Sequence, residues 1–338
     1  MRVLVTGGAG FIGSHVVEAL LDGGADVRVL DRVEASDLDA RAELLVGDVA
    51  DPEVVAAAVD GVEAVCHQAA KVGLGVDFGD VRAYVGDNDV GTAVLLDGLW
   101  RRGFQGRLVL ASSMVVYGEG RSRCAEHGES TPAPRLEVDL REGRFEPRCP
   151  ADGCGRTMEW APVDEDTPAD PRNVYAATKL HQEHLCSLWG RESGATVVAL
   201  RYHNVYGPRM PRDTPYAGVA AIFRSALAGG RQPRVFEDGG QTRDFVHVRD
   251  VARANVLALT GDGVRSGAFN VASGTPHTVL DLALALGAEQ PEITGDFRVG
   301  DVRHIVASPR RAADELGFRA GVGFEEGMAE FATAALRG

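Results

Sequence analysis

Cysteine is scarce in this sequence, since only five of its 338 residues are Cys. So few thiols exclude a disulfide scaffold in a chain of this length, and the odd number leaves at least one of them unpaired. Long hydrophobic runs are also missing, because no stretch approaches the run of about 20 apolar residues that spans a bilayer. The first residues lack the basic segment and the cleavable apolar segment of a secretory signal. These absences predict a globular protein in the cytoplasm, with no membrane partner.

Positive charge is in short supply as well. The sequence has 35 Lys and Arg residues against 49 Asp and Glu residues, and its formal net charge is −14. Nucleic acids and anionic membrane surfaces both require a basic face, so neither is predicted as a partner. An anionic ligand would instead be held by a few placed Arg side chains and by helix N-termini.

Short apolar runs alternate with longer amphipathic stretches over the first 200 residues, and no repeat of fixed period indicates a solenoid. This alternation is typical of βαβ units around a parallel sheet. We therefore predict a Rossmann-type, doubly wound α/β domain over residues 1–200. Its strands are expected at residues 2–6, 26–30, 43–46, 64–67, 108–111 and 196–200, and its helices at residues 11–21, 52–59, 90–102 and 173–193.

Two segments depart from this pattern. Residues 118–162 are rich in Arg, Glu, Pro and Gly with little periodicity, which indicates an insertion between a strand and the next helix. Beyond residue 202 the sequence becomes irregular and is broken by prolines, as expected of a binding lobe built from loops. We assign residues 201–243 and 273–338 to a smaller C-terminal substrate-binding lobe. We expect about residues 244–272 to return to the first domain.

Three glycines, Gly7, Gly10 and Gly13, directly follow the first predicted strand and open the first helix. The first allows a tight turn, the second lets the backbone approach a pyrophosphate, and the third lets the helix pack against the sheet. Asp31 ends the second strand about 20 residues later, where its carboxylate can accept both ribose hydroxyls and would repel a 2′-phosphate. NAD is therefore favoured over NADP, although Arg32 beside this Asp weakens the preference.

Residues at the ends of two further strands are predicted to complete the cofactor site. Asp48, after the third strand, is placed to meet the adenine amino group. Gln68, Ala69 and Ala70, after the fourth strand, can line the pyrophosphate and the nicotinamide riboses. The alternative is that Asp48 and Gln68 are ordinary turn residues at strand ends.

Tyr175 and Lys179 are four residues apart in a predicted helix, so their side chains leave the same face. This spacing is common by chance, but with the glycine loop and Ser113 at the end of the fifth strand it forms a candidate catalytic set. The base must remove a proton from a hydroxyl near neutral pH, whereas a free Tyr has a pKa of about 10. An adjacent ammonium and a positive nicotinamide would lower that pKa by roughly three units, which corresponds to about 4 kcal/mol.

Together these residues resemble the extended short-chain dehydrogenase/reductase family, specifically its nucleotide-sugar epimerase and dehydratase branch. The resemblance covers nearly the whole chain. Its marks are the glycine loop, Ser112-Ser113 ahead of Tyr117-Gly118, Tyr175 with Lys179, and the segments 201–208, 243–248 and 269–271.

The resemblance implies roles for further residues. In that family the segment matching residues 202–204 covers the nicotinamide and touches the substrate diphosphate. Arginines matching Arg243 and Arg298 clamp the same phosphates, which suits the bidentate geometry of Arg, although either one could be a surface residue. The predicted substrate contacts are Ser113, Tyr175, Asn204, Arg243 and Arg298. The predicted cofactor contacts are Gly7, Gly10, Phe11, Ile12, Gly13, Asp31, Arg32, Asp48, Val49, Gln68, Ala69, Ala70, Asn88, Ser112, Tyr175, Lys179 and Tyr202, of which Asn88 orients the site.

The residues just before Tyr117 bear on the reaction. Related 4,6-dehydratases carry an Asp-Glu pair there and related decarboxylases a Glu, whereas this chain has Met114 and Val115, which cannot transfer protons. The resemblance therefore implies 4-epimerisation of a UDP- or dTDP-linked hexose or hexuronate, with Tyr175 as base and NAD taking and returning the C4 hydride. The alternatives are a nucleotide-sugar reductase or dehydrogenase that releases its cofactor, and a non-catalytic NAD-binding regulator.

A homodimer is also implied by the resemblance. Family members often pair through two helices that form a four-helix interface. In this chain the helices expected at residues 90–102 and 173–193 would be the ones used.

Four residues of the insertion are candidate metal ligands. Cys124 with His127, and Cys149 with Cys154, resemble the two knuckles of a zinc ribbon, and four such ligands suit tetrahedral zinc. The second pair is separated by four residues instead of the usual two, so three free surface thiols are the alternative. A complete set of four ligands would order the insertion and would not perform catalysis.

Overall fold

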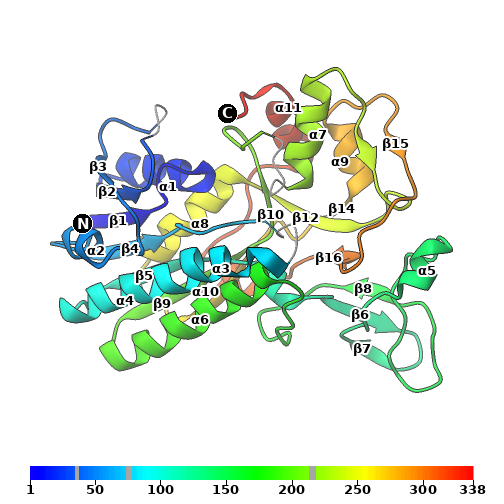
Figure 1. The fold of residues 1–338 in the computed structure, drawn as a ribbon, viewed down its shortest axis with the longest axis horizontal. Coiled ribbons are helices and arrows are strands. Elements are labelled where there is room, and N and C mark those ends of the chain that lie inside the picture. Colours follow the sequence, from blue (N-terminus) through cyan, green and yellow to red (C-terminus); the bar gives the residue numbers. More distant parts are fainter. Residues whose placement is uncertain (35–37, 74–77, 213–217, 338) are drawn as a thin grey trace.

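A seven-stranded parallel sheet forms the centre of the computed structural model, which describes residues 1–34, 38–73, 78–212 and 218–337. The strand order is β13-β9-β5-β4-β1-β2-β3, with helices on both faces (Figure 1). This arrangement confirms the predicted doubly wound fold. The strands are β1 (Arg2–Thr6), β2 (Asp26–Asp31), β3 (Glu43–Val46), β4 (Ala64–His67), β5 (Arg107–Ser113), β9 (Thr196–Tyr202) and β13 (Gly267–Val271).

The predicted strands are close to the observed ones, and the larger differences fall at their carboxyl ends. β5 and β9 each run two residues further than expected, to Ser113 and Tyr202. Parallel pairing continues over this extension, because Ser112 pairs with Arg201 and Ser113 with Tyr202. Ser113, which the sequence predicts to be catalytic, therefore stands on a paired strand, which fixes its backbone more firmly than a loop would.

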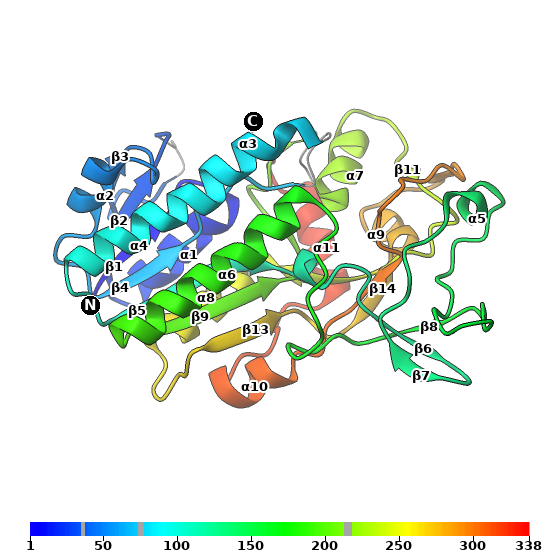
Figure 2. The same ribbon diagram turned by 60° about the horizontal axis from the view of Figure 1, so that its bottom comes forward.

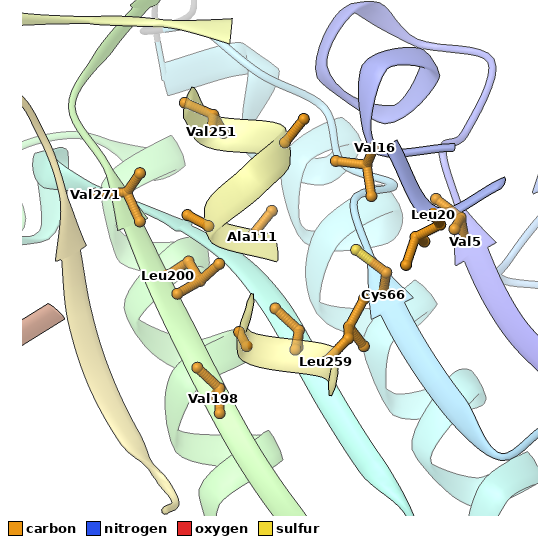
Figure 3. Close-up of a cluster of buried hydrophobic side chains, with 14 of the residues drawn as sticks. Val5, Val16, Leu20, Cys66, Ala111, Val198, Leu200, Val251, Leu259 and Val271 are labelled. Atoms are coloured by element: carbon orange, nitrogen blue, oxygen red, sulfur yellow. The ribbon is translucent and has the colours of Figure 1, made fainter. Parts of the chain in front are cut away.

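One face of the sheet is covered by α1 (Phe11–Asp22), α8 (Val248–Thr260) and α10 (Arg310–Leu316). Figure 3 shows how Val16 from α1 and Val251 from α8 meet side chains of the strands. Parallel strands that are buried on both faces require continuous apolar runs, which accounts for the Val- and Leu-rich strand sequences.

The opposite face is covered by α2 (Pro52–Ala58), α4 (Gly91–Arg101) and α6 (Val174–Ser193). α3 (Val81–Tyr84) and a π-helical turn over Val85–Val90 lead into α4. α4 and α6 lie side by side along the outside of this layer (Figure 2). None of the helices in the described parts of the chain has the length and apolar character needed to cross a membrane.

The elements that follow Tyr202 alternate between the main sheet and a smaller lobe. β10 (Asn204–Tyr206), β12 (Thr242–His247), β14 (Pro276–Thr278) and β16 (His304–Ile305) form the lobe's sheet. Packed with it are α7 (Val219–Ala228), α9 (Val279–Ala285) and α11 (Phe324–Thr333), and β11 (Arg234–Val235) pairs with β15 (Glu292–Ile293).

This interleaving differs in two places from the boundaries expected from sequence. β12 crosses the expected boundary between residues 243 and 244, because the whole strand pairs within the lobe's sheet. α10 falls in the range 273–338 but packs on the main sheet, where Ala312 and Leu316 join the core beside α8. Both elements are short, and neither carries a periodic signal long enough to show which body it joins.

The insertion is a small module of its own between β5 and α6. β6 (Arg121–Cys124) is the middle strand of a three-stranded antiparallel sheet with β7 (Gly128–Ser130) and β8 (Glu159–Ala161), and α5 (Glu137–Arg141) lies in the connection between β7 and β8. The module extends from the end of the molecule that also carries the C-terminal lobe (Figure 1).

Candidate active site

A cavity of about 370 Å³ opens at the carboxyl ends of β1, β2, β4 and β5. This is the edge at which doubly wound sheets bind their ligands. Of the residues predicted to contact a cofactor, all except Asp48 and Asn88 line the cavity. The cavity therefore joins the glycine loop, the end of β2 and the Tyr175-Lys179 pair in one space.

The glycine loop fits closely against the sheet and leaves its outer side open. Gly7 has φ +68°, and a Cβ there would lie 2.7 Å from the backbone nitrogen of Ala69. A Cβ on Gly13 would collide with the Gly7 carbonyl oxygen. A Cβ on Gly10 would meet only that same oxygen, at 3.1 Å, and this residue lines the cavity. The loop is thus a cradle whose open side lies at Gly10.

The first turn of α1 faces this cradle. The helix begins at Phe11 with Gly10 as its N-cap, and a glycine has no side chain that could accept from the first amide groups. Those amides and the positive end of the helix are available to an anion. The arrangement fits the pyrophosphate of a dinucleotide.

Asp31 and Arg32 lie at the end of β2, where a ribose would be bound. The Asp31 carboxylate accepts from the amide of Ala9 at 3.0 Å, so it also anchors the glycine loop. Arg32 forms ion pairs with Asp48 at 2.9 Å and with Asp87 at 2.8 Å, and these carboxylates raise its pKa. Two neighbouring carboxylates thus neutralise the only feature of the sequence that weakened the preference for NAD.

The two predicted cofactor residues outside the lining support the cavity from behind. Asp48 holds Arg32 and accepts from the amide of Ala50 at 2.8 Å. Asn88 is fully buried, accepts from the amide of Lys71 at 2.7 Å and donates to the hydroxyl of Thr178 at 2.9 Å. Asn88 therefore ties the segment after β4 to α6, one turn from the predicted base.

Tyr175 and Lys179 line the cavity, whereas Ser113, which follows the lining residue Ser112, does not. Asn173 caps α6 by accepting from the amide of Ala176, which places Tyr175 in the first turn of the helix. The side chains of Ser113 and Tyr175 are hydrogen-bonded to each other. Lys179 Nζ donates to the Ala111 carbonyl oxygen at 2.8 Å and lies 6.0 Å from the centre of the Tyr175 ring.

Burial changes the pKa of both titrating groups. It raises the pKa of Tyr175 to about 12, against which the hydrogen bond from Ser113 acts, and it lowers the pKa of Lys179 to about 8. Both shifts disfavour charge in a site without other ions. Lowering the pKa of Tyr175 for base catalysis therefore requires further positive charge beside the phenol.

Two supporting residues were not predicted from sequence. Glu183 on α6 accepts from the hydroxyl of Ser112 at 2.5 Å and from Arg201. The Ser112 hydroxyl is therefore held by a residue that does not itself line the cavity. Asn255 on α8 accepts from Gln68 Nε2 at 3.0 Å and from the Tyr202 hydroxyl at 2.9 Å. Apart from the Glu183–Arg201 pair, which spans 18 positions, these contacts join residues more than 50 positions apart, and nothing in the local sequence indicates them.

The cavity has six further lining residues that sequence reasoning missed. Most of these residues stand directly beside a predicted position in the chain, so reasoning from strand ends could have found them. Pro211, from the C-terminal lobe, gives no such signal. The six are Leu30, Gly47, Val72, Asp87, Ala111 and Pro211.

The predicted substrate residues of the lobe have contrasting surroundings. Asn204 Oδ1 is buried and has no hydrogen-bond partner among the described residues. Arg243 is buried and donates to the carbonyl oxygens of Thr242, Val302 and Arg303, and burial lowers its pKa. Arg298 is exposed, and its guanidinium lies 5.4 Å from the centre of the Phe236 ring.

The four predicted metal ligands lie in the insertion, outside the lining of this cavity. The structure brings Cys124, His127, Cys149 and Cys154 together, with one ligand atom of each within 4.8 Å of the others. Cys66 and Cys186 lie apart from them, fully buried on opposite faces of the main sheet.

Comparison with known proteins places this site in a family. The model of the NAD-dependent epimerase/dehydratase family matches residues 3–137 and 154–272. A dTDP-L-rhamnose 4-epimerase of Burkholderia thailandensis is 33% identical over 98% of this chain and 94% of its own length.

Solved structures agree with this match. The UDP-glucose 4-epimerase of Thermotoga maritima, determined with UDP-glucose, has a TM-score of 0.81 and is 29% identical, with 98% of this chain and 97% of that chain covered. The UDP-glucose 4-epimerase of Thermus thermophilus, determined with NAD, has a TM-score of 0.77 at 32% identity, with 98% of both chains covered. The chain belongs to the NAD-dependent epimerase/dehydratase family.

Proposed function

We propose that the protein is a nucleotide-diphosphate-sugar 4-epimerase acting on a UDP- or dTDP-linked hexose or hexuronate. The observation that carries this proposal is that Tyr175, hydrogen-bonded to Ser113, lines the same cavity as Lys179 and the glycine loop. When bound, NAD supplies a hydride acceptor that can return the hydride to the same carbon. The similarity to sugar-nucleotide 4-epimerases supports this reaction class.

Different residues of the cavity would bind different parts of the cofactor. The amides at the start of α1 would hold the pyrophosphate, and the open side at Gly10 leaves room for it. The Asp31 carboxylate would accept the hydroxyls of the adenosine ribose and repel a 2′-phosphate. Lys179, held by the Ala111 carbonyl oxygen, would keep a positive charge beside the phenol.

Tyr175 acts as both the base and the acid of the reaction. Its phenolate oxygen takes the proton of the C4 hydroxyl when that carbon is oxidised and gives the proton back to the C4 oxygen when it is reduced. Ser113 bonds the same hydroxyl and orients it. The partly exposed positions just after Ser113 are Met114 and Val115, which offer no second acid or base for removing water. The proton therefore has one carrier, as an epimerisation at a single carbon requires.

The substrate diphosphate would be held from the C-terminal lobe. Three N–H groups of Arg243 donate to backbone carbonyl oxygens, and the Asp301 carboxylate lies 3.6 Å from Nη2, too far for a hydrogen bond. Among the described residues, Nε–H and one Nη2–H therefore make no hydrogen bond and could bind an anion. Side-on pairing through those two groups suits a phosphate. Asn204 has a buried acceptor that a substrate hydroxyl or amide could satisfy.

A homodimer through α4 and α6 is part of the proposal. Val90, Trp100 and Leu188 lie on or next to these helices and are 47%, 51% and 49% exposed. Exposed apolar side chains of this size on neighbouring helices are typical of an interface. Light scattering on the purified protein would give the mass of a dimer, and Trp100→Glu would shift it toward that of a monomer.

A panel of UDP- and dTDP-hexoses tests the reaction. The purified enzyme, without added NAD, is incubated with each sugar nucleotide, and the configuration at C4 is followed by NMR. We expect one or more sugars to reach an equilibrium mixture of C4 epimers with no net NADH. Net NADH formation by a protein purified without bound NAD would indicate a dehydrogenase or reductase. Binding of NAD with no change in any sugar would indicate a regulator.

A further inference from the structure

The insertion brings together four side chains that lie outside the active-site cavity. Cys124 and His127 flank the turn between β6 and β7. Cys149 and Cys154 lie in a second hairpin-like loop, closed by the hydrogen bond from the Cys149 amide to the Arg156 carbonyl oxygen. Two turns from different parts of the insertion thus present two ligand atoms each to one point.

The separations of these atoms match a tetrahedral metal site. Cys124 Sγ lies 3.9 Å from Cys154 Sγ and 3.7 Å from His127 Nδ1, and Cys149 Sγ lies 3.6 Å from the same nitrogen. Zinc bonds of about 2.3 Å to sulfur and about 2.0–2.1 Å to nitrogen place two sulfurs about 3.8 Å apart and a sulfur and a nitrogen about 3.6 Å apart. A disulfide would need about 2.05 Å between sulfurs. These three separations match ligands around an ion, and the four ligand atoms all lie within 4.8 Å of one another.

Backbone amides reinforce the two turns. The amides of Glu126 and His127 donate to Cys124 Sγ, and the amide of Ala151 donates to Cys149 Sγ. Hydrogen bonds of this kind fix the position of each sulfur relative to the backbone of its turn. Each loop is therefore shaped to hold its sulfur in place for an ion.

The apolar core of the insertion is too small to hold it in shape. Its cluster consists of Cys124, Cys149 and Met158, with Ala151 and Cys154 packed against them. A module with so little apolar burial needs a further cross-link, usually a disulfide or a metal. Three members of the cluster carry the sulfurs themselves. An ion at their centre would supply the cross-link that apolar contacts do not.

We propose that the insertion holds a structural zinc ion bound by Cys124, His127, Cys149 and Cys154. The four nitrogen and sulfur ligands close the coordination sphere, so the ion orders the loops and takes no part in the reaction. The family model skips residues 138–153, which include Cys149. One of the four ligands therefore lies outside the matched residues, whereas Cys124, His127 and Cys154 lie within them.

Buried charges connect the insertion to the C-terminal lobe. Arg303 donates to Glu146 of the insertion at 2.7 Å and to Glu237 of the lobe at 2.8 Å. Arg135 of the insertion pairs with the same Glu237 at 2.8 Å, and the three side chains of Arg135, Glu237 and Arg303 are at most 4% exposed. Buried charges that lose a partner are strongly destabilising. Displacement of the insertion would therefore disturb the lobe.

The same series of contacts ends at Arg243, the residue proposed to bind the substrate diphosphate. Arg243 donates to the carbonyl oxygens of Val302 and Arg303, and Glu146 lies three residues before Cys149. The zinc-held loop thus positions the segment that orients Arg243. This consequence for the substrate rests on the proposed function, whereas the zinc site does not.

Zinc content tests the site directly. The protein is purified without chelators and its metals are measured by elemental analysis, with one zinc expected per chain. Cys149→Ser and Cys154→Ser should lose the ion, whereas Cys186→Ala, which removes a buried thiol of α6, should keep it. Exchange with Co²⁺ should give the visible absorption of a tetrahedral thiolate site. A purified protein that neither contains nor takes up zinc, or Ser variants that keep it in full, would overturn the proposal.

Two kinds of variant test the effect on the lobe. One removes the contact between Glu146 and Arg303, and the other removes the zinc ion. Glu146→Gln should keep zinc and raise KM for the sugar nucleotide severalfold, with kcat and bound NAD little changed. Cys154→Ser should lose zinc and raise KM in the same way, and Glu126→Gln, beside the cluster, should change neither. Limited proteolysis needs no turnover, and we expect Cys154→Ser to be cleaved within residues 118–162. Zinc loss with unchanged KM and unchanged cleavage would overturn the positioning role.

Discussion

The proposed cofactor side and the proposed substrate side of the active site are built in different ways. On the cofactor side, the glycine loop, Asp31 and Lys179 stand on elements of the main sheet and its covering helices. On the substrate side, Arg243 is held by the carbonyl oxygens of residues 302 and 303, and that segment is held in turn by the insertion. Changes far from the cavity should therefore affect substrate binding more than cofactor binding.

The largest effect is expected from removing the base on the cofactor side. Tyr175→Phe should lower kcat by roughly 10²–10⁴-fold, which is the usual contribution of a general base. Bound NAD should remain, because the glycine loop and Asp31 are untouched. The measurement is turnover of the accepted sugar nucleotide together with the NAD released on denaturation. Tyr84→Phe removes a hydroxyl from a ring whose centre lies 6.0 Å from that of Tyr175, and it serves as the control. Retained turnover would remove Tyr175 from the mechanism.

Lys179→Met should shift the pH dependence of the reaction. The ammonium of Lys179, whose pKa burial lowers to about 8, favours the phenolate at lower pH. Without it the pKa of Tyr175 rises, so the acidic limb of the pH profile of kcat/KM should move to higher pH by roughly 1–3 units.

Lys71 offers the matched control for this change, because it is the one other lysine of the chain. Lys71→Met should leave the acidic limb in place. An acidic limb that stays where it was in Lys179→Met would show that the ammonium does not set the pKa of the base.

A smaller effect is expected from filling the cradle. A Cβ on Gly10 would meet only the Gly7 carbonyl oxygen of the protein, at 3.1 Å, and would lie at the open side of the loop. Gly10→Ala should therefore weaken NAD binding by about tenfold, or 1.4 kcal/mol, with little change in the melting temperature of the cofactor-free protein. Titration of NAD by calorimetry measures the affinity. Gly86→Ala, where an added Cβ meets nothing within 4 Å, should change neither quantity. A stability loss without loss of affinity in Gly10→Ala would contradict the cradle.

The sequence predicts well which residues line the cavity, for a physical reason. Parallel strands end at one edge, so residues that follow different strands, such as Gly7, Asp31 and Gln68, must meet there. Tyr175 and Lys179 share a helix face by their spacing alone. These positions follow from local periodicity, which a single sequence contains.

The contacts that hold these residues could not be predicted. Glu183 reaches Ser112 across 71 positions of the chain, and Asn255 reaches Gln68 across 187. Which helix face meets which strand depends on packing in three dimensions, and neither residue stands in a recognisable motif. The link from Glu146 to Arg303 spans 157 positions and joins the insertion to the lobe, so no local pattern indicates it.

The smallest effect is expected from replacing Arg298, the exposed one of the two arginines that are proposed to bind the substrate diphosphate. Arg243 is buried and fixed by backbone carbonyl oxygens, whereas Arg298 is exposed and lies over Phe236. An exposed charge contributes about 1 kcal/mol at most, so Arg298→Ala should raise KM by no more than about fivefold. The increase should shrink with added salt, because screening acts on exposed charges.

Arg298→Lys should keep most of the effect of the charge, whereas Arg243→Lys should raise KM more, because Lys cannot pair side-on with a phosphate. Equal increases for Arg298→Ala and Arg243→Lys would mean that both arginines contact the diphosphate directly, and that the buried frame gives Arg243 no advantage.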